Sequence, residues 1–132
     1  MADFASALHS RLTAAGPVTA IVGTKVYWVK VPQNQARPYI RLQTISDVRP
    51  QHLQGYDSAR VTRVQCDCFA ETYAVARDMA EKVIAALATP ATVGGIFFGR
   101  IKAEGPRDLG EDVGTTFVHR TSVDLLVEHT TP

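Results

Sequence analysis

The chain has 132 residues, a length typical of one domain with an ordinary core, so we expect a single domain over residues 1–132. Its 14 lysines and arginines are nearly balanced by 13 aspartates and glutamates. This balance offers no basic field for a nucleic-acid backbone and no acidic field for a basic partner. The sequence shows neither a secretory leader pattern nor the roughly 20 apolar residues of a membrane span. We therefore expect a protein of the cytosol, or of something assembled there.

The N-terminal third predicts a helix followed by two strands. Asp3 is a suitable N-cap for a first amphipathic helix, which ends near Gly16, and a further helical turn is expected at 18–22. Residues 25–31 and 39–46 then alternate between apolar and polar side chains, as half-buried strands do. A polar loop with a proline at each end separates these two strands.

The central segment changes its period from that of a strand to that of a helix. Residues 62–69 alternate, whereas residues 75–87 carry an apolar stripe at helical spacing. The strand and the helix must pack together to bury these faces. The preceding segment, 47–58, has no period and is expected to be an exposed loop.

The C-terminal part predicts a short strand at 96–101 and a long final strand at 117–128. Between them, residues 102–115 combine glycines, a proline and charges without a period, which indicates a solvent-facing loop or hairpin tip. Together the segments predict an α+β fold: a mostly antiparallel sheet of about five strands with two main helices packed on one face. The 96–101 strand should run parallel to the 62–69 strand, with the final strand between them.

Side-chain complementarity predicts how the central and final strands pair. Placing Arg63 opposite Asp124 also brings Asp67 opposite Arg120 and joins apolar residues on the inner face. In this register Cys68 lies opposite His119.

The two cysteines, Cys66 and Cys68, lie on one face of the central strand, too close along it for an unstrained disulfide. They would supply only two zinc ligands, and His119 could supply a third, but the second close ligand pair of zinc motifs is absent. Free cysteine is among the most buried residue types. We therefore expect two unbonded thiols beneath the helix, beside Met79 and Val83, and no metal site.

No catalytic or cofactor-binding constellation is evident, so the sequence does not predict an enzyme. The glycines lack the spacing of phosphate-binding loops. Glu111, Asp112 and Asp108 could coordinate a hard cation, but they lack the acidic spacing of an EF-hand, which favours a solvated acidic loop. Tyr27 and Trp28 have no further aromatic residues at strand spacing, which favours packing over a base or sugar platform. The histidines show no metal-binding or catalytic spacing: His9, His52, His119 and His129.

One run of sequence is similar to a known family. VQCDCFAETYAVARDMAEKVIAAL, residues 64–87, matches the V-Q-x-D-x-[FW]-A-x-[ST]-Y-x-x-A-x-x-[LM]-A run of small tail-completion or tail-terminator proteins of long-tailed bacteriophages and phage-like particles. The segments LTAAGPVTAIVGTKVYWVKVPQNQARPYIRLQTIS and SVDLLVEH extend the resemblance over nearly the full length. The family has no catalytic motif, so the resemblance implies no catalytic residue.

The resemblance implies a structural virion protein that forms a homo-oligomeric ring, usually of six subunits. Such a ring caps the tail tube at its head-proximal end and joins it to the head, after assembly in the host bacterial cytoplasm. The implied partners are further copies, the tail tube protein and a head-side connector or stopper protein, with no membrane. The genome would pass through the lumen without specific binding. Another neck or minor tail protein is the nearest alternative, and a small-ligand-binding module is a more distant one.

Apolar residues on a nominally solvated face, together with strand ends and long loops, suggest where a ring interface would form. A ring needs two different patches that meet between neighbouring copies. The residues expected at these interfaces are Val26, Trp28, Gln33, Arg37, Arg107, Asp108, Val118 and Leu126.

Overall fold

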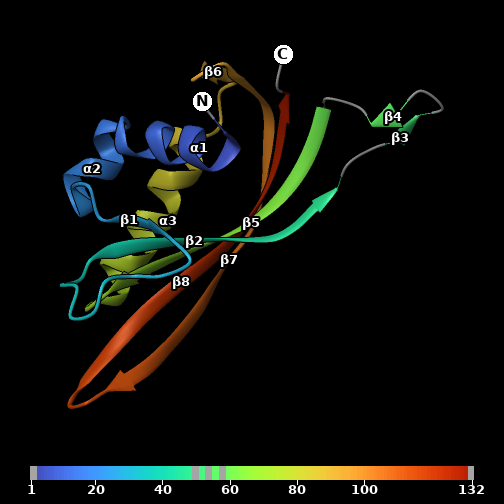
Figure 1. Ribbon diagram of the computed structural model, residues 1–132. Coiled ribbons are helices and arrows are strands. Elements are labelled where there is room, and N and C mark those ends of the chain that lie inside the picture. Colours follow the sequence, from blue (N-terminus) through green and yellow to red (C-terminus); the bar gives the residue numbers. More distant parts are fainter. Residues whose placement is uncertain (1–2, 49–50, 53–54, 57–58, 131–132) are drawn as a thin grey trace.

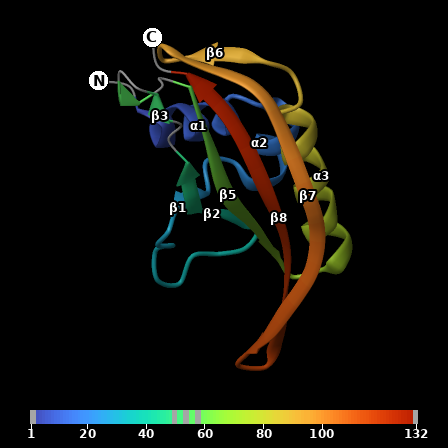
Figure 2. The same ribbon diagram turned by 90° about the vertical axis from the view of Figure 1, so that its right-hand side faces the viewer.

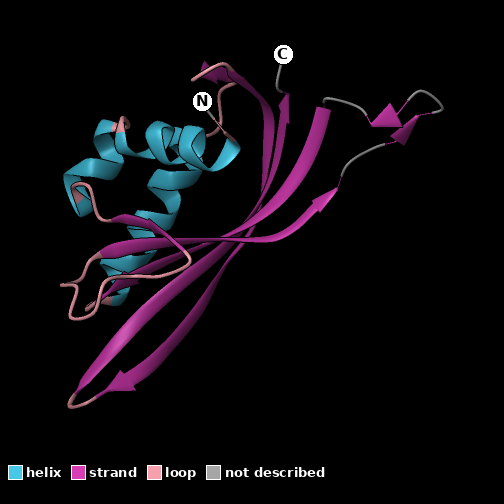
Figure 3. Cartoon of the chain, in the orientation of Figure 1, coloured by secondary structure: helices cyan, strands magenta, loops and turns pink. Residues whose placement is uncertain are grey.

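The computed structural model describes residues 3–48, 51–52, 55–56 and 59–130. These residues form an α+β fold in which three helices pack on one face of a curved six-stranded sheet (Figures 1 and 3). The α+β class and the placement of the helices agree with the sequence prediction. The sheet has six strands where about five were expected, and a third helix stands where only a helical turn was expected.

The helices begin and end where local chemistry requires. In α1, Phe4–Thr13, the carboxylate of Asp3 accepts a hydrogen bond from the backbone N–H of Ser6 at 2.7 Å. The second helix, α2, spans Gly16–Val22 and has a proline in its first turn, where the missing N–H costs nothing. The third, α3, spans Tyr73–Ala86 and is capped by Thr72.

The main sheet has the strand order β1-β2-β5-β8-β7-β6. The first pair, β1 and β2, is parallel, and the other neighbouring pairs described in this sheet are antiparallel. It follows that β7 runs parallel to β5 with β8 between them, as the sequence predicted. The strands of this sheet are β1 (Val26–Trp28), β2 (Tyr39–Val48), β5 (Ala59–Ala70), β6 (Ala91–Val93), β7 (Ile96–Val113) and β8 (Thr116–Thr130).

Two segments expected to be loops contain strands. Residues 102–115 belong mostly to β7, which continues to Val113 and turns at Gly114, where φ is +63°. The hairpin-tip alternative is right for the end of this segment, since β7 turns there into β8. The loop alternative was wrong, because residues 107–113 of β7 are exposed on both sides and need no apolar alternation. Within 47–58, β2 continues to Val48, and β3 (Gln51–His52) pairs with β4 (Gly55–Tyr56). Residues 49–50, 53–54 and 57–58 lie outside the described residues.

The predicted register between the central and final strands was wrong by two residues. Arg63 of β5 lies opposite Leu126 of β8, Asp67 lies opposite Ser122, and Cys68 lies opposite Thr121. A shift of two keeps every side chain on its expected face. The Arg63 guanidinium still reaches Asp124, at 2.8 Å, because its side chain is long enough to contact the residue two positions from its direct partner Leu126 on β8. Charge complementarity alone therefore could not choose between the two registers.

The core lies between the helices and the inner face of the sheet. Cys66 and Cys68 are unbonded and fully buried, in one apolar cluster with Met79 and Val83 of α3. A hydrogen bond with Cys66, together with burial, raises the pKa of the Cys68 thiol, so this thiol stays neutral. The prediction of core thiols is confirmed.

Replacing Cys66 with serine is expected to lower the free energy of unfolding by about 1–3 kcal/mol, because a hydroxyl would replace a small apolar group in this core. Urea unfolding of the wild-type and C66S proteins measures the difference. Serine is nearly isosteric with cysteine, so a stability equal to that of the wild type would contradict the apolar surroundings seen here.

Candidate assembly interface

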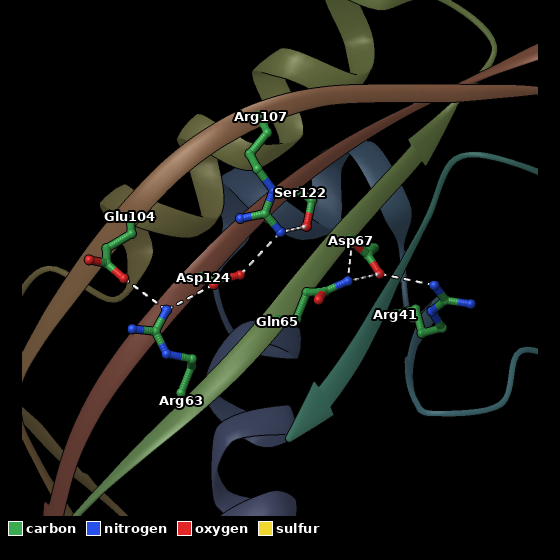
Figure 4. Close-up of polar contacts among 8 residues, drawn as sticks. All are labelled: Arg41, Arg63, Gln65, Asp67, Glu104, Arg107, Ser122 and Asp124. Atoms are coloured by element: carbon green, nitrogen blue, oxygen red, sulfur yellow. Dashed lines mark hydrogen bonds and ion pairs between the residues drawn. The ribbon is translucent and has the colours of Figure 1, made fainter. Parts of the chain in front are cut away.

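The sheet face opposite the helices, here called the open face, is not covered by any element of the described chain (Figure 2). Alternate residues of four strands line it, as the pleat of a sheet requires. Two polar clusters dominate its centre (Figure 4). Their members are Arg41, Arg63, Gln65, Asp67, Glu104, Arg107, Ser122 and Asp124.

The first cluster surrounds Asp67, whose side chain is 0% exposed. Arg41 donates a hydrogen bond to it at 3.0 Å, and the side-chain amide of Gln65 lies 3.0 and 3.1 Å from its two carboxylate oxygens. Arg41 also lies over the ring of Phe69, 5.2 Å from its centre. A buried carboxylate is costly unless it is paired in this way.

The second cluster is centred on Arg63, whose Nη1 lies 2.8 Å from both Glu104 and Asp124. Hydrogen bonds with Glu104 and Asp124 raise the pKa of Arg63. Arg107 donates to Ser122 at 3.2 Å and to Asp124 at 3.4 Å. The arginines in the centre of the open face are thus neutralised within the subunit.

Beyond the helices, β7 and β8 continue as a projecting hairpin, here called the arm, residues 107–121 (Figures 1 and 2). Asp108 at its base lies 3.4 Å from Arg77 of α3. A bulge between Glu104 and Arg107 precedes the arm and contains Gly105 at φ +104°, a conformation that favours glycine. Because of this bulge, Arg107 faces the open side while Asp108 faces the helices.

The arm exposes large apolar side chains that the isolated subunit does not cover. Leu109, Val113 and Phe117 are 39%, 49% and 47% exposed. Near its tip, Glu111 and Asp112 are also exposed and form no ion pair with any residue that the structure describes. A projecting hairpin with exposed apolar groups is typical of a surface that binds another protein chain.

At the other end of the same sheet lies an open pocket of about 200 Å³, here called the hollow. Val61 and Phe97 form exposed apolar walls, and Gly99 leaves its floor open because it has no side chain. The residues that line the hollow are Arg60, Val61, Phe97, Gly99, Glu128, His129 and Thr130. A second hollow, of about 180 Å³, lies at the start of α3 and includes Arg37, which pairs with Glu71 at 3.3 Å.

The expected interface residues fall into two groups. Val26 and Val118 are buried within the subunit, and Trp28 packs against Phe4 and donates its indole N–H to Ala5 at 3.0 Å. These three side chains contribute to the subunit's own packing. The others lie at least partly on the surface, and their role in an interface stays a prediction: Gln33, Arg37, Arg107, Asp108 and Leu126.

Sequence reasoning missed the exposed apolar residues of the arm and the hollow. Phe97 could have been found, because alternation along the predicted strand 96–101 puts Ile96 and Phe98 on one face and Phe97 on the other. Val113 carried no such signal, because it lies within the segment 102–115 that was interpreted as a loop or hairpin tip. Phe117 is the first residue of the predicted final strand, where alternation does not yet say which face is buried. Their exposure became visible only once β7 and β8 were seen to pair as far as the tip.

One polar group resembles a catalytic triad in composition but not in arrangement. The Thr62 hydroxyl lies 3.1 Å from Asp47 and 2.8 Å from Nε2 of His129, so it stands between the imidazole and the carboxylate. In a nucleophilic triad the imidazole occupies that central place. Thr62 is also 1% exposed and cannot reach a substrate. The group therefore ties the end of β8 to β5 and β2.

The buried position of His129 has a consequence for stability. Burial lowers the pKa of His129, the charge of Arg60 adds to this effect, and Asp47 opposes it. The unfolded chain gains a proton on this residue near the ordinary histidine pKa of about 6.5, whereas the folded chain gains it only at lower pH. The unfolded state thus binds more protons as the pH falls, so acidification through this range should reduce stability.

We expect the urea midpoint of the wild-type protein to fall between about pH 7.5 and pH 5.5, and to fall less in H129Q. The variant has no imidazole to hold neutral, so this contribution disappears even if its stability at neutral pH is lower. Parallel pH profiles for the two proteins would show that His129 makes no such contribution.

Within the described ranges, no group of three or more histidine, cysteine, aspartate or glutamate side chains is placed to hold a metal ion. In the same ranges, no helix is long and apolar enough to cross a membrane.

Over residues 6–128 the chain matches the family described as "Tail completion protein gp17". The chain belongs to this family. The family assignment makes it a structural component of a phage-type tail, and it confirms the resemblance seen in residues 64–87.

Solved structures share the fold of this tail-completion protein. A chain of the "Virion of native gene transfer agent (GTA) particle" aligns with a TM-score of 0.70 and 21% identity, over 96% of this chain and 92% of that one. A second solved chain aligns with a TM-score of 0.56 and 16% identity, again over 96% and 92% of the two chains. No curated protein sequence matches significantly. At these identities the structural likeness concerns the fold.

Proposed function

We propose that this tail-completion protein forms a closed homo-oligomeric ring, of six copies, that caps the tail tube and joins it to the head. The observation that carries the proposal is the arm, which projects from the subunit and exposes Leu109, Val113 and Phe117. The hollow at the opposite end of the sheet provides a second, different patch. Two different patches make a heterologous contact, and such contacts produce rings when the rotation between copies closes.

The partners of this ring are the tail tube protein on one side and a head-side connector or stopper protein on the other. The genome would pass through the lumen without specific binding. The open face supports this, because the arginines of its two clusters are paired with Asp67, Glu104 and Asp124. Paired arginines contribute little to the phosphate contacts that dominate nucleic-acid binding.

A small-ligand-binding module is less well supported by the two hollows that described residues line. The two hollows have volumes of about 200 and 180 Å³. Pockets that enclose a drug-sized ligand usually measure about 300–1,000 Å³. A hollow of this smaller size suits a few side chains of a protein partner.

Electron microscopy tests the proposal, applied to particles produced after the gene for this protein has been deleted. We expect tails of irregular length, some carrying abnormally polymerised tube, and heads that are not joined to tails. A plasmid copy of the wild-type gene should restore uniform, joined particles. Tails of normal length with unjoined heads would favour a neck protein instead. Normal tails joined to heads would refute the proposed role.

A further inference from the structure

The arm tip and the hollow are complementary in shape and in apolar character. At the tip, Val113 and Leu109 share the open-face side of β7, and they lie opposite Thr116 and Arg120 of β8. In the hollow, Val61 and Phe97 are 38% and 46% exposed beside the uncovered floor at Gly99. One patch projects and the other is concave, and each leaves apolar surface in water that a partner would cover.

Their charges are also complementary. Glu111 and Asp112 at the tip have no ion-pair partner among the described residues. Arg100 and Lys102, which follow the hollow along β7, are exposed and likewise form no ion pair within that part of the chain. Two charged residues line the hollow itself: Glu128, and Arg60, which is paired with Asp47. Arg100 and Lys102 beside the hollow therefore leave its surroundings with an excess of positive charge.

The two patches cannot meet within one subunit, because they lie at opposite ends of the sheet formed by β7 and β8 (Figure 2). We propose that the arm tip of each copy docks into the hollow of the next, with Val113 against Val61 and Phe97. Glu111, which shares the open-face side of β7 with Val113, then faces Arg100 and Lys102, and Asp112 on the other side of the strand adds to the negative charge of the tip. The occupant of the hollow is thus a second copy of this chain. This inference rests on the proposed ring and assigns the surfaces that hold it together.

Crosslinking tests the contact directly. Cys66 and Cys68 are fully buried and need not be removed. The crosslinker therefore reacts with cysteines introduced on the surface. We expect the double variant V61C/V113C, assembled into tails and treated with a short bis-maleimide, to give a ladder of covalent multimers on denaturing gels. Each single variant has one added thiol per chain and can give at most dimers. The matched pair E81C/V113C, with a thiol on the exposed surface of α3, should give no ladder.

A missing ladder for V61C/V113C, or an equal one for E81C/V113C, would overturn the docking. A ladder confined to V61C/V113C supports it, because multimers beyond the dimer require contact between two different sites on successive copies.

Charge reversal gives an independent test in complemented deletion particles. E111K/D112K and R100E/K102E should each reduce the yield of joined particles at least about tenfold, because like charges then face each other across the contact. Combining all four changes should restore the yield. D78K/E81K on α3 changes the net charge as E111K/D112K does and should leave the yield unchanged.

The two proposals fail in different ways. If the deletion gives irregular, unjoined tails while both reversed pairs assemble normally, the docking is wrong and the ring function stands. The docking is also overturned if the fourfold variant assembles no better than the two pairs. If the deletion leaves normal joined tails, the ring function itself fails, whatever the variants do.

Discussion

Replacing Phe98 with alanine is expected to lower the free energy of unfolding by about 3–5 kcal/mol. Phe98 is 0% exposed and is among the largest fully buried side chains of the core. Its ring lies 6.0 Å from that of Phe4, and the guanidinium of Arg11 lies 5.5 Å from its centre, so it joins α1 to β7. Its removal would leave a cavity that the rigid sheet beneath α1 could not fill.

The neighbouring residue supplies a matched control. Phe97 points to the other side of β7 and is 46% exposed, so F97A should change stability by no more than about 0.5 kcal/mol. Urea unfolding of the two variants measures the contrast. Similar losses would show that the alternation along β7 is not as described here. Because Phe97 lines the hollow, F97A should instead reduce assembly into tails.

The sequence predicted well those elements that bury one face. The alternation in 62–69 and the helical stripe in 75–87 arise because each element must place its apolar residues in a shared core, and β5 and α3 confirm both. Caps at Asp3 and Thr72 leave a similar local signature.

The arm could not be predicted in this way. From Arg107 to Val113, β7 is exposed, so no apolar period distinguishes a strand from a loop. Its structure comes from backbone pairing with β8, which is a property of two segments together and leaves no periodic signal in either one. The bulge at Gly105 removes any remaining regularity, since it changes which residues face the helices.

For a related reason, the sequence could predict the candidate interface only in part. Val26 and Trp28 were expected at an interface because they are apolar residues on one face of the predicted strand 25–31, and alternation alone does not say whether that face meets a helix or a partner. In the fold, α1 covers that face, and Trp28 donates to its backbone at Ala5. An edge strand with a large apolar residue therefore indicates packing as readily as it indicates a partner.

The second large effect is expected on the open face, where R41M should lower the free energy of unfolding by about 3 kcal/mol. The Asp67 side chain is 0% exposed and, among the described side chains, would keep only the amide of Gln65 as a partner. The estimate lies at the low end for a broken buried pair because Arg41 is 29% exposed, so water can reach part of the site. Methionine retains the aliphatic bulk and can still contact the Phe69 ring.

The same substitution at Arg63 is the control. Its partners Glu104 and Asp124 are 44% and 17% exposed, so water can solvate them, and R63M should lower the free energy of unfolding clearly less than R41M does. The double variant R41M/D67N should be more stable than R41M, because no uncompensated charge then lies buried in the sheet. Urea unfolding of the four proteins, with the wild type as reference, tests both comparisons. If R41M costs no more than R63M, or if D67N gives no rescue, the buried ion pair does not stabilise this face as proposed.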